Sequence, residues 1–477
     1  MGIQWVWHGA RRAGDRVLSV FAVDPSSGRA LPYVDGLRAI AVLFIIVLHS
    51  WQISGASALN LSLPGLSGAW NVAPLIESFQ LGVPLFFVLS GFLLALPFIR
   101  AHANGQPAPS LRRYFTLRAA RIMPAYYFLL FCLLVLLTPL YVPPALVYSQ
   151  VGAIAVMAHL FFLQEMIPVA SSSFNADPVL WTLTMEVLFY LVLPWVVRYF
   201  YGRRWIVSLP LSAVISVGWL FLCWHGLSAL VPVIQAQATG TPALAGHLNA
   251  TQSYLLLERQ LPAHAVDFGL GMTVANWYVR GLAEWASRVR AAVCGTAVLG
   301  GWALVLWVMA ATSDFRSFWA PPPAAAMADW ISLVHIGVTY YLRETLASLG
   351  FALVLAGVAF GQPWLQAPYS VTPVRVFGMI SYSIYLWHYI VISLLARWWP
   401  AVHIQRVLTA PAALSRFWLL LLGALVIVVP LAGAIYLLIE RPILRLVRRP
   451  RAPVHVAPVV AGALPDLEPV VNQRAHR

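Results

Sequence analysis

Residues 36–53 read GLRAIAVLFIIVLHSWQI, an apolar run with Arg38 near its start and His49 near its end. A helix that crosses the hydrocarbon core of a bilayer needs about 20 predominantly apolar residues, which is the length of this run. We expect helices because lipid leaves no other partner for the backbone, and the alternating pattern of a membrane barrel is absent. Ten such runs occur, at 36–53, 80–99, 122–141, 179–197, 205–225, 262–280, 291–312, 346–361, 376–396 and 417–439.

The composition of the whole chain agrees with a membrane protein. Of its 477 residues, 61% are hydrophobic and only 10% are charged, and the mean hydropathy is +0.79. Because a water-soluble domain carries about 25% charged residues, we exclude a soluble fold and a disordered chain. Cys132, Cys223 and Cys294 each lie within an apolar run and show neither disulfide nor metal-ligand spacing, so we expect no disulfide scaffold and no metal site.

The basic charge of the chain predicts its orientation in the membrane. The net charge of +14 comes from 30 basic residues, all of them arginine, clustered between the apolar runs. This is the pattern of the positive-inside rule and does not indicate nucleic-acid binding. With ten spans both termini are cytoplasmic and 24 arginines lie inside against 6 outside. If the short apolar run 151–163 also crossed, 16 arginines would lie inside and 14 outside, which the positive-inside rule disfavours. We therefore interpret this run as interfacial or re-entrant.

The chain divides into one large membrane domain and two tails. External connections are expected at 142–178, 226–261 and 313–345. Asp177 and Pro178 form a helix-start signal before the fourth span. The predicted parts are a cytoplasmic N-terminal segment at 1–30, the membrane domain at 31–449 and a disordered cytoplasmic tail at 450–477.

Ionisable side chains inside predicted spans are costly and therefore indicate function. Arg38 and His49 are eleven residues apart, which places them within about 20° on one helix stripe and roughly 16 Å apart along it. Asp35 can pair with Arg38 on the same face. Taken singly, Arg38 could be a topology anchor and His49 a packing residue; the shared stripe favours function. Glu186, about two turns into the fourth span from outside, could orient an imidazole, accept from a sugar hydroxyl or pair internally.

Two further polar groups are candidates. Arg118 and Arg121 can face the same way where the third span begins, and paired guanidiniums suit a phosphate-bearing ligand. Topology signalling or anionic lipid is the alternative interpretation of these arginines. Tyr382, Tyr385 and His388 form a stripe in the ninth span, where hydrogen bonding between helices is the alternative to catalysis.

Six strings along the chain point to one family. They are DGLRAIAV at 35–42 followed by His49, FFVLSGF at 86–92, RAARIMPAYY at 118–127, WTLTMEVLFY at 181–190, SYSIYLWH at 381–388 and ERP at 440–442. In this order, over roughly residues 31–449, they resemble the acyltransferase-3 family of integral membrane O-acyltransferases. One departure is Thr182, where the family commonly has serine.

The resemblance implies an activity and a set of site residues. Members of the family move an acyl group, commonly acetyl from acetyl-CoA, to a hydroxyl of a carbohydrate or a glycosylated natural product. The family's Arg–ten residues–His signature falls on Arg38 and His49, and its paired-arginine signature on Arg118 and Arg121. The resemblance therefore implies a cytoplasmic acyl-CoA co-substrate that meets the arginines, and an acceptor that enters from outside past Glu186.

The chemistry of acyl transfer asks for a base and for oxyanion donors. A neutral histidine is a suitable general base for a hydroxyl, so His49 would deprotonate the acceptor or carry the acyl group transiently. Ser90, Tyr382, Tyr385 and His388 are candidate donors to the oxyanion. The main alternative is a secondary transporter of a polar or glycosylated molecule. For an enzyme, the acceptor could be a surface polysaccharide, lipopolysaccharide, peptidoglycan or a secreted glycoside, and the expected location is a bacterial plasma membrane.

Overall fold

The computed structural model describes residues 14, 16–22, 31–62, 69–137, 149–173, 178–227, 229–232, 255–281, 287–311, 341–399 and 410–448. The predicted tail at 450–477, most of the connections at 226–261 and 313–345, and Asp177 lie outside these residues. The expected fold class is confirmed, because the described chain is helical apart from one short antiparallel hairpin.

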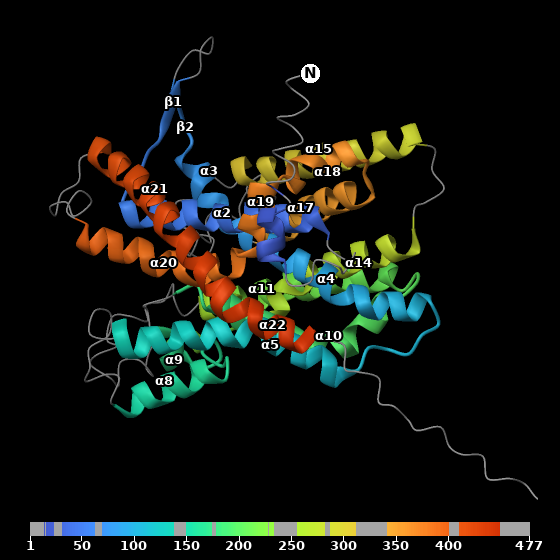
Figure 1. The fold of residues 1–477 in the computed structure, drawn as a ribbon, viewed down its shortest axis with the longest axis horizontal. Helices are drawn as coiled ribbons and strands as arrows, with labels where there is room; N and C mark the ends of the chain where they lie inside the picture. The colour runs from blue at the N-terminus through green and yellow to red at the C-terminus, as the bar shows by residue number, and fades with distance from the viewer. Residues whose placement is uncertain are drawn as a thin grey trace, which may run out of the picture.

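The helices follow the predicted spans along the chain (Figure 1). The elements are α2 (Pro32–Ser54), β1 (Asn60–Ser62), β2 (Ala69–Asn71), α3 (Ala73–Glu77), the turn η1 (Ser78–Leu81), α4 (Gly82–Ala103), α5 (Leu111–Phe131), η2 (Cys132–Leu137), α8 (Gln150–Leu160), α9 (Pro168–Ser173), α10 (Trp181–Val196), η3 (Val197–Phe200), α11 (Trp205–His225), η5 (Leu261–His264), α14 (Ala265–Arg280), α15 (Ser287–Ala311), α17 (Arg343–Phe360), α18 (Pro363–Ser370), α19 (Thr372–Met379), α20 (Ser381–Trp398), α21 (Ala410–Ile435), η8 (Tyr436–Glu440) and α22 (Arg441–Arg448).

Most of the predicted spans coincide with helices that are long and apolar enough to cross a membrane. Within the described ranges, eight helical stretches are long and apolar enough to cross a membrane, or nine if α19 and α20 count as one bent span. The predicted span at 262–280 is the one that does not meet this length and hydropathy test. That run is the 3₁₀ turn η5 followed directly by α14, and it carries His264, Asp267 and Arg280, which lower its hydropathy. Because α14 is buried from Val266 to Asn276, it lies inside the bundle rather than against lipid.

The predicted ninth span is broken at its start. α19 and α20 meet at an angle of 73° around Ile380. A Cβ on Gly378 would overlap the carbonyl oxygen of Asp35, so α19 packs backbone to backbone against the start of α2. The bend then directs α20 along α2, and the string Ser381–His388 comes to face that helix.

Glycines also bring α4 and α14 into close contact. A Cβ on Gly91 would overlap the Phe268 carbonyl oxygen, and one on Gly271 would overlap that of Val88. Small residues at a crossing allow two membrane helices to approach this closely. Since α4 also contacts α2, it lies between α2 and α14 in the centre of the molecule.

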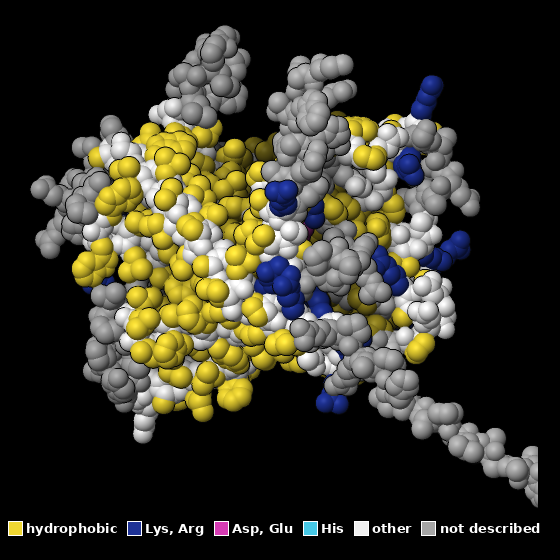
Figure 2. Space-filling view, in the orientation of Figure 1, with side chains coloured by type: hydrophobic (Ala, Val, Ile, Leu, Met, Phe, Trp, Pro, Cys, Tyr) yellow, Lys and Arg dark blue, Asp and Glu magenta, His cyan; other side chains and the backbone are white. Residues whose placement is uncertain are grey.

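The surface separates into an apolar region and an arginine end. Figure 2 shows a broad hydrophobic face on the left, where α20 and α21 lie in Figure 1, and arginine side chains gathered toward the right. On α21 and η8, Val426 is 74% and Leu438 76% exposed, which suits contact with lipid. We call the right-hand side, where α4 and α14 finish and α5 starts, the arginine end. Its position agrees with the one-sided arginine distribution read from the sequence.

The short apolar run 151–163 forms α8, at the side opposite the arginine end (Figure 1). Ser149 caps it by accepting from the Gly152 amide at 3.1 Å. Its last turn is held by the Tyr126 hydroxyl, which donates to the His159 carbonyl at 2.8 Å, and by Tyr127, which donates to Leu160 at 2.9 Å. With 11 residues, α8 is too short to cross a membrane as a helix.

Candidate active site

His49 on α2 meets His388 on α20 in the interior of the bundle. His49 Nδ1 lies 2.8 Å from His388 Nε2. The ring centroids are 5.0 Å apart and the planes differ by 18°. Tyr389, the next residue on α20, packs edge-on against His49, with 5.2 Å between the centroids. His388 is completely buried and His49 is only half-buried, so His49 is the more exposed member of the pair.

A second polar contact ties α20 to the start of α10. The Thr182 hydroxyl donates to the Tyr385 hydroxyl at 2.8 Å, and Tyr385 donates to the Val179 carbonyl at 3.1 Å. The Tyr385 and His388 rings are 5.6 Å apart. Thr182, which departs from the family's usual serine, therefore keeps the hydroxyl that this contact needs.

Glu186 lies with residues of the arginine end rather than with His49. Its Oε1 accepts from the Tyr190 hydroxyl at 2.6 Å and from the Ser90 hydroxyl at 3.3 Å. The Arg118 guanidinium carbon lies 6.0 Å from the centre of the Tyr190 ring. Of the roles expected for Glu186, internal pairing is the one that these contacts display, and no imidazole is hydrogen-bonded to it among the described residues.

The two arginines of the paired-arginine string have different surroundings. Arg121 Nη1 forms a salt bridge of 2.8 Å with Glu440, which is completely buried and also accepts from the Ser383 hydroxyl. The Arg121 guanidinium also lies over the Tyr382 ring, 5.5 Å from its centre. Arg118 has no carboxylate within 4.0 Å among the described residues, and its Nε is buried without a hydrogen-bond partner there. The charge of Arg118 is therefore available to a ligand, and that of Arg121 is already neutralised.

The predicted pairing of Asp35 with Arg38 is replaced by another. Asp35 Oδ2 lies 3.9 Å from Arg375 Nε on α19, which packs across the start of α2. Arg38 forms no salt bridge within the described ranges, but it interacts electrostatically with Arg121, Asp35 and Glu186. Half-buried and with no carboxylate within 4.0 Å among the described residues, Arg38 is a second cation at this level of the bundle that no salt bridge occupies.

The hydroxyl candidates for oxyanion stabilisation already donate to the protein. Ser90 donates to Glu186, Tyr385 to a backbone carbonyl, and Tyr382 to the Ile122 carbonyl at 2.9 Å. His388 Nδ1 donates to the Tyr385 carbonyl at 2.7 Å, and its Nε2 faces His49. In this arrangement each of these groups positions a helix or a ring, and an oxyanion would have to displace an existing bond.

Charged residues from the external connections lie near the start of α10. The Arg259 guanidinium carbon is 4.8 Å from the centre of the Trp181 ring, and Gln260 Nε2 donates to the Glu165 carbonyl at 2.9 Å. Burial raises the pKa of Glu165, although Arg259 opposes the shift. Burial and the charge of Glu344 raise the pKa of Glu258 to about 8. The carboxyl groups of Glu165, Glu258 and Glu344 therefore lie around the Arg259 guanidinium at this end.

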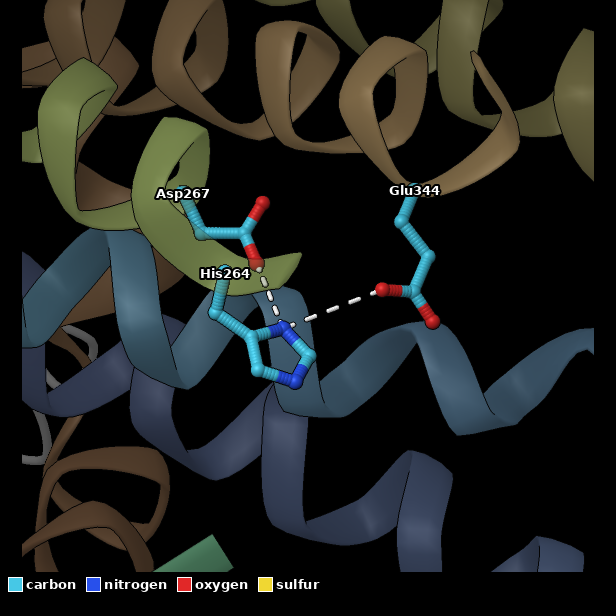
Figure 3. A group of neighbouring side chains, drawn as sticks. All are labelled: His264, Asp267 and Glu344. Carbon is cyan, nitrogen blue, oxygen red and sulfur yellow. Dashed lines mark hydrogen bonds and ion pairs between the residues drawn. The ribbon is translucent and has the colours of Figure 1, made fainter. Parts of the chain in front are cut away.

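A second imidazole centre lies beside this group (Figure 3). His264 Nδ1 is 3.2 Å from Asp267 Oδ2 and 3.8 Å from Glu344 Oε2, and Ser348 donates to Asp267 Oδ1 at 2.6 Å. The three ligand-type atoms lie within 4.8 Å of one another, so these are the described residues that could hold a metal ion. His264 Nδ1 hydrogen bonds to Asp267, and Ser348 on α17 donates to the same carboxylate, which ties the start of α14 to the start of α17. His264 is 3% exposed and packs on Phe87 and Trp181.

Several residues of the site escaped the sequence reasoning. Ser383 and Glu440 stood inside quoted strings without a role, and the structure gives them the neutralisation of Arg121. Glu344 and Arg259 lie in external connections, where a lone charge is ordinary. Only the unusual pair of ionisable residues in the sixth span, His264 and Asp267, carried a signal that could have been followed further.

Comparison with known families identifies the class of protein to which the chain belongs. The family model described as an acyltransferase domain matches residues 31–437, and the chain belongs to this acyltransferase-3 family. The resemblance inferred from the six strings is thereby confirmed. The chain is a multi-pass membrane protein of this family, and the assignment favours an enzyme over a transporter.

The chain is similar to part of several bacterial proteins. The chain is 26% identical over 424 residues to the protein named YrhL of Bacillus subtilis, covering 87% of this chain and 55% of the relative. It is 25% identical over 377 residues to the peptidoglycan O-acetyltransferase OatA of Listeria monocytogenes, covering 77% and 50%. A segment of 201 residues is 30% identical to the O-acetyltransferase OatA of Staphylococcus aureus, covering 40% and 29%. The chain thus spans about half the length or less of these relatives, and no solved structure matches it.

Proposed function

We propose that the protein is a membrane O-acyltransferase that moves an acyl group, in the simplest case acetyl from acetyl-CoA, to a hydroxyl of a carbohydrate. The observation that carries this proposal is the half-buried imidazole of His49, which lies on the same helix as Arg38 and contacts His388 on α20. The family membership and the names of the OatA relatives support the class of reaction.

The donor is proposed to approach from the arginine end. Coenzyme A carries several phosphates, and guanidiniums bind phosphate through paired hydrogen bonds. Arg118 and Arg38 are free of salt bridges among the described residues, whereas Arg121 is occupied by Glu440. Arg38 and His49 are eleven residues apart on α2, about 16 Å along the helix, a distance that the extended arm of the cofactor can cover.

The proposed reaction is written with His49 as the proton carrier. The imidazole accepts the proton of the acceptor hydroxyl while the oxygen attacks the thioester carbonyl carbon. The carbon–sulfur bond then breaks, the new ester is released, and the thiolate takes the proton from the imidazolium. If His49 itself attacks first, an acyl-imidazole forms and the hydroxyl resolves it, with the same ester and thiol as products.

The acceptor is proposed to be a carbohydrate of the cell envelope and to approach from the side opposite the arginine end. The relatives named peptidoglycan O-acetyltransferases support this class of acceptor. Trp181, Arg259 and Glu165 lie at that side of α10, and aromatic and charged side chains of this kind suit a polyhydroxyl ligand.

The test is acyl transfer by the protein in lipid nanodiscs with acetyl-CoA and peptidoglycan fragments. We expect thiol release that depends on the acceptor, and a mass increase of one acetyl group on the saccharide. His49→Gln should lower this rate by about 10²–10⁴-fold, because the general base is lost.

The matched control is His102→Gln, which removes a histidine that is exposed and stacks on Tyr201 at the arginine end. This variant should keep full activity. The proposal fails if a correctly folded His49→Gln protein transfers acetyl at the original rate, or if the saccharide leaves the reaction unmodified.

A further inference from the structure

The partners of His388 determine which of its nitrogens carries hydrogen. His388 Nδ1 lies 2.7 Å from the carbonyl oxygen of Tyr385, one turn earlier on α20. A carbonyl only accepts, so Nδ1 must be the protonated nitrogen. In a neutral ring, Nε2 of His388 then carries a lone pair and can act only as an acceptor.

That acceptor faces His49. The two nitrogens are 2.8 Å apart, while the ring centroids are 5.0 Å apart and the planes differ by 18°. Rings stacked face to face could not have centroids so much farther apart than their nearest nitrogens. The imidazoles are therefore nearly coplanar and meet edge to edge, which is the arrangement of an N–H···N hydrogen bond. The hydrogen between them belongs to His49 Nδ1.

We propose that His388 is a positioning residue, which holds His49 as the Nδ1–H tautomer and leaves His49 Nε2 as the nitrogen that meets the substrate. This role rests on the function proposed for His49, although the tautomer itself does not. A chain of hydrogen bonds thus runs from the Tyr385 carbonyl through His388 to His49. In this tautomer, His49 Nε2 carries a lone pair.

The surroundings favour the neutral form of this pair. No carboxylate lies within hydrogen-bonding distance of either ring among the described residues, and His388 is completely buried. A charged ring in such a setting would be costly. When His49 Nε2 takes a proton from a hydroxyl, its Nδ1–H continues to donate to His388, and this bond strengthens because the donor has become cationic.

The same geometry separates the two histidines by role. Both nitrogens of His388 are engaged and its ring is buried, so it does not reach a substrate. His49 is half-buried, and Tyr389 packs edge-on against it, which limits rotation of the ring. A second imidazole thus takes the orienting place that the sequence analysis considered for the Glu186 carboxylate.

The first test reads the tautomer directly and needs no activity. In the full-length protein in lipid, labelled with ¹³C,¹⁵N-histidine, solid-state NMR distinguishes protonated from unprotonated ring nitrogens, and a one-bond correlation to Cγ identifies Nδ1. Comparison with His49→Gln assigns the His49 signals. We expect protonated Nδ1 and unprotonated Nε2 at His49, and a mixed tautomer population in His388→Phe, which keeps a ring but removes the acceptor.

The second test compares two replacements of His388 kinetically. His388→Phe should lower kcat by about 10²–10⁴-fold, because His49 loses its orientation and the hydrogen bond that strengthens as the imidazolium forms, and part of it adopts the wrong tautomer. The KM values for acetyl-CoA and acceptor should stay within about twofold, since no binding contact is lost. His388→Gln, whose amide oxygen can accept from His49 Nδ1 and whose amide nitrogen can donate to the Tyr385 carbonyl, should recover at least about tenfold of the lost kcat.

The outcomes separate this inference from the proposed function. A protonated Nε2 at His49 in the unaltered protein overturns the inference, as does equal kcat for the Phe and Gln variants in folded protein. If the tautomer is as expected but the unaltered protein transfers no acyl group, the positioning geometry stands and the proposed function fails.

Discussion

Two imidazoles in this molecule have opposite surroundings. His49 is half-buried and is supported by a neutral ring, which is in turn supported by a backbone carbonyl. His264 is 3% exposed and faces the carboxylates of Asp267 and Glu344. Both rings use Nδ1 toward the protein, so residue type and tautomer do not distinguish them.

What distinguishes them is access and charge. The Asp267 carboxylate beside His264 accepts from its ring and, with Glu344, forms a contact between the starts of α14 and α17, and the His264 Nε2 is buried without a partner among the described residues. In the proposed reaction, the His388 support beside His49 lets a proton arrive and leave, and the His49 ring is only half-buried. A histidine inside a membrane bundle therefore acts chemically or structurally according to its support and exposure.

Replacing Asp267 should have the largest effect and tests the structural role of His264. We expect Asp267→Ala to lower the free energy of unfolding by about 3–5 kcal/mol, because the buried His264 and Ser348 lose their common partner. The rate of acyl transfer by the folded fraction should change little. Thermal unfolding in nanodiscs, followed by tryptophan fluorescence, measures the first quantity, and acceptor-dependent thiol release measures the second.

Glu344→Gln is the control for this experiment, because Glu344 is partly exposed and lies farther from His264, at 3.8 Å. Its effect on stability should be about 1 kcal/mol or less. If Asp267→Ala instead abolished transfer without lowering the melting temperature, the two imidazoles would belong to the same functional class and the distinction would be lost.

Arg118 and Arg121, on the proposed donor side, also differ in their surroundings. Arg121→Gln should destabilise the protein by about 3 kcal/mol, because it leaves Glu440 buried without its counter-ion, and adding Glu440→Gln should recover part of this loss. Arg118→Gln should leave the melting temperature unchanged and raise the KM for acetyl-CoA about tenfold, through the loss of a charge-assisted hydrogen bond to phosphate.

Melting temperatures and KM values of the three variants decide this prediction. A stable Arg121→Gln protein with a raised KM for acetyl-CoA would mean that Arg121, rather than Arg118, binds the donor.

The smallest expected effect concerns Glu258, whose carboxyl group lies in the electrostatic field of Glu344. Its pKa is raised to about 8 by burial and by the charge of Glu344. The folded protein therefore keeps a proton that the unfolded chain releases at lower pH, so this contribution to stability is present in acid and is lost as the pH rises through about 8. The melting temperature should fall by a few degrees between pH 6 and pH 9.

Glu258→Gln, which stays uncharged throughout, should reduce this fall in melting temperature. Identical pH profiles for the variant and the original protein would show that the carboxyl group at this position titrates normally.

Much of the fold followed from the sequence alone. Hydropathy located each long helix, and the strings around Arg38, Arg118 and Trp181 indicated the family before any coordinates. The run at 262–280 was recognised as a helix, but hydropathy did not reveal that protein rather than lipid surrounds it. The break before Ser381 was missed because it arises from the contact of Gly378 with Asp35, which are far apart in sequence.

The partners within the site were less predictable. Asp35 and Arg38 are close in sequence, yet Arg375 takes Asp35 because α19 crosses the start of α2. Arg118 and Arg121 are three residues apart and look equivalent, but only one of them faces Glu440. Such pairings depend on how helices rotate and cross, and the hydropathy pattern carries little information about either.

The sequence by itself determined that this chain is a helical membrane protein, which family it belongs to and which ionisable residues stand inside the helices. It could do so because lipid imposes strict and local rules on composition. Only the tertiary structure decided that His49 faces a second histidine, that Glu186 bonds Ser90 and Tyr190, and that His264 is enclosed by carboxylates. Each of these contacts joins residues on different helices or sets the direction of a side chain, and short-range energetics does not determine such choices.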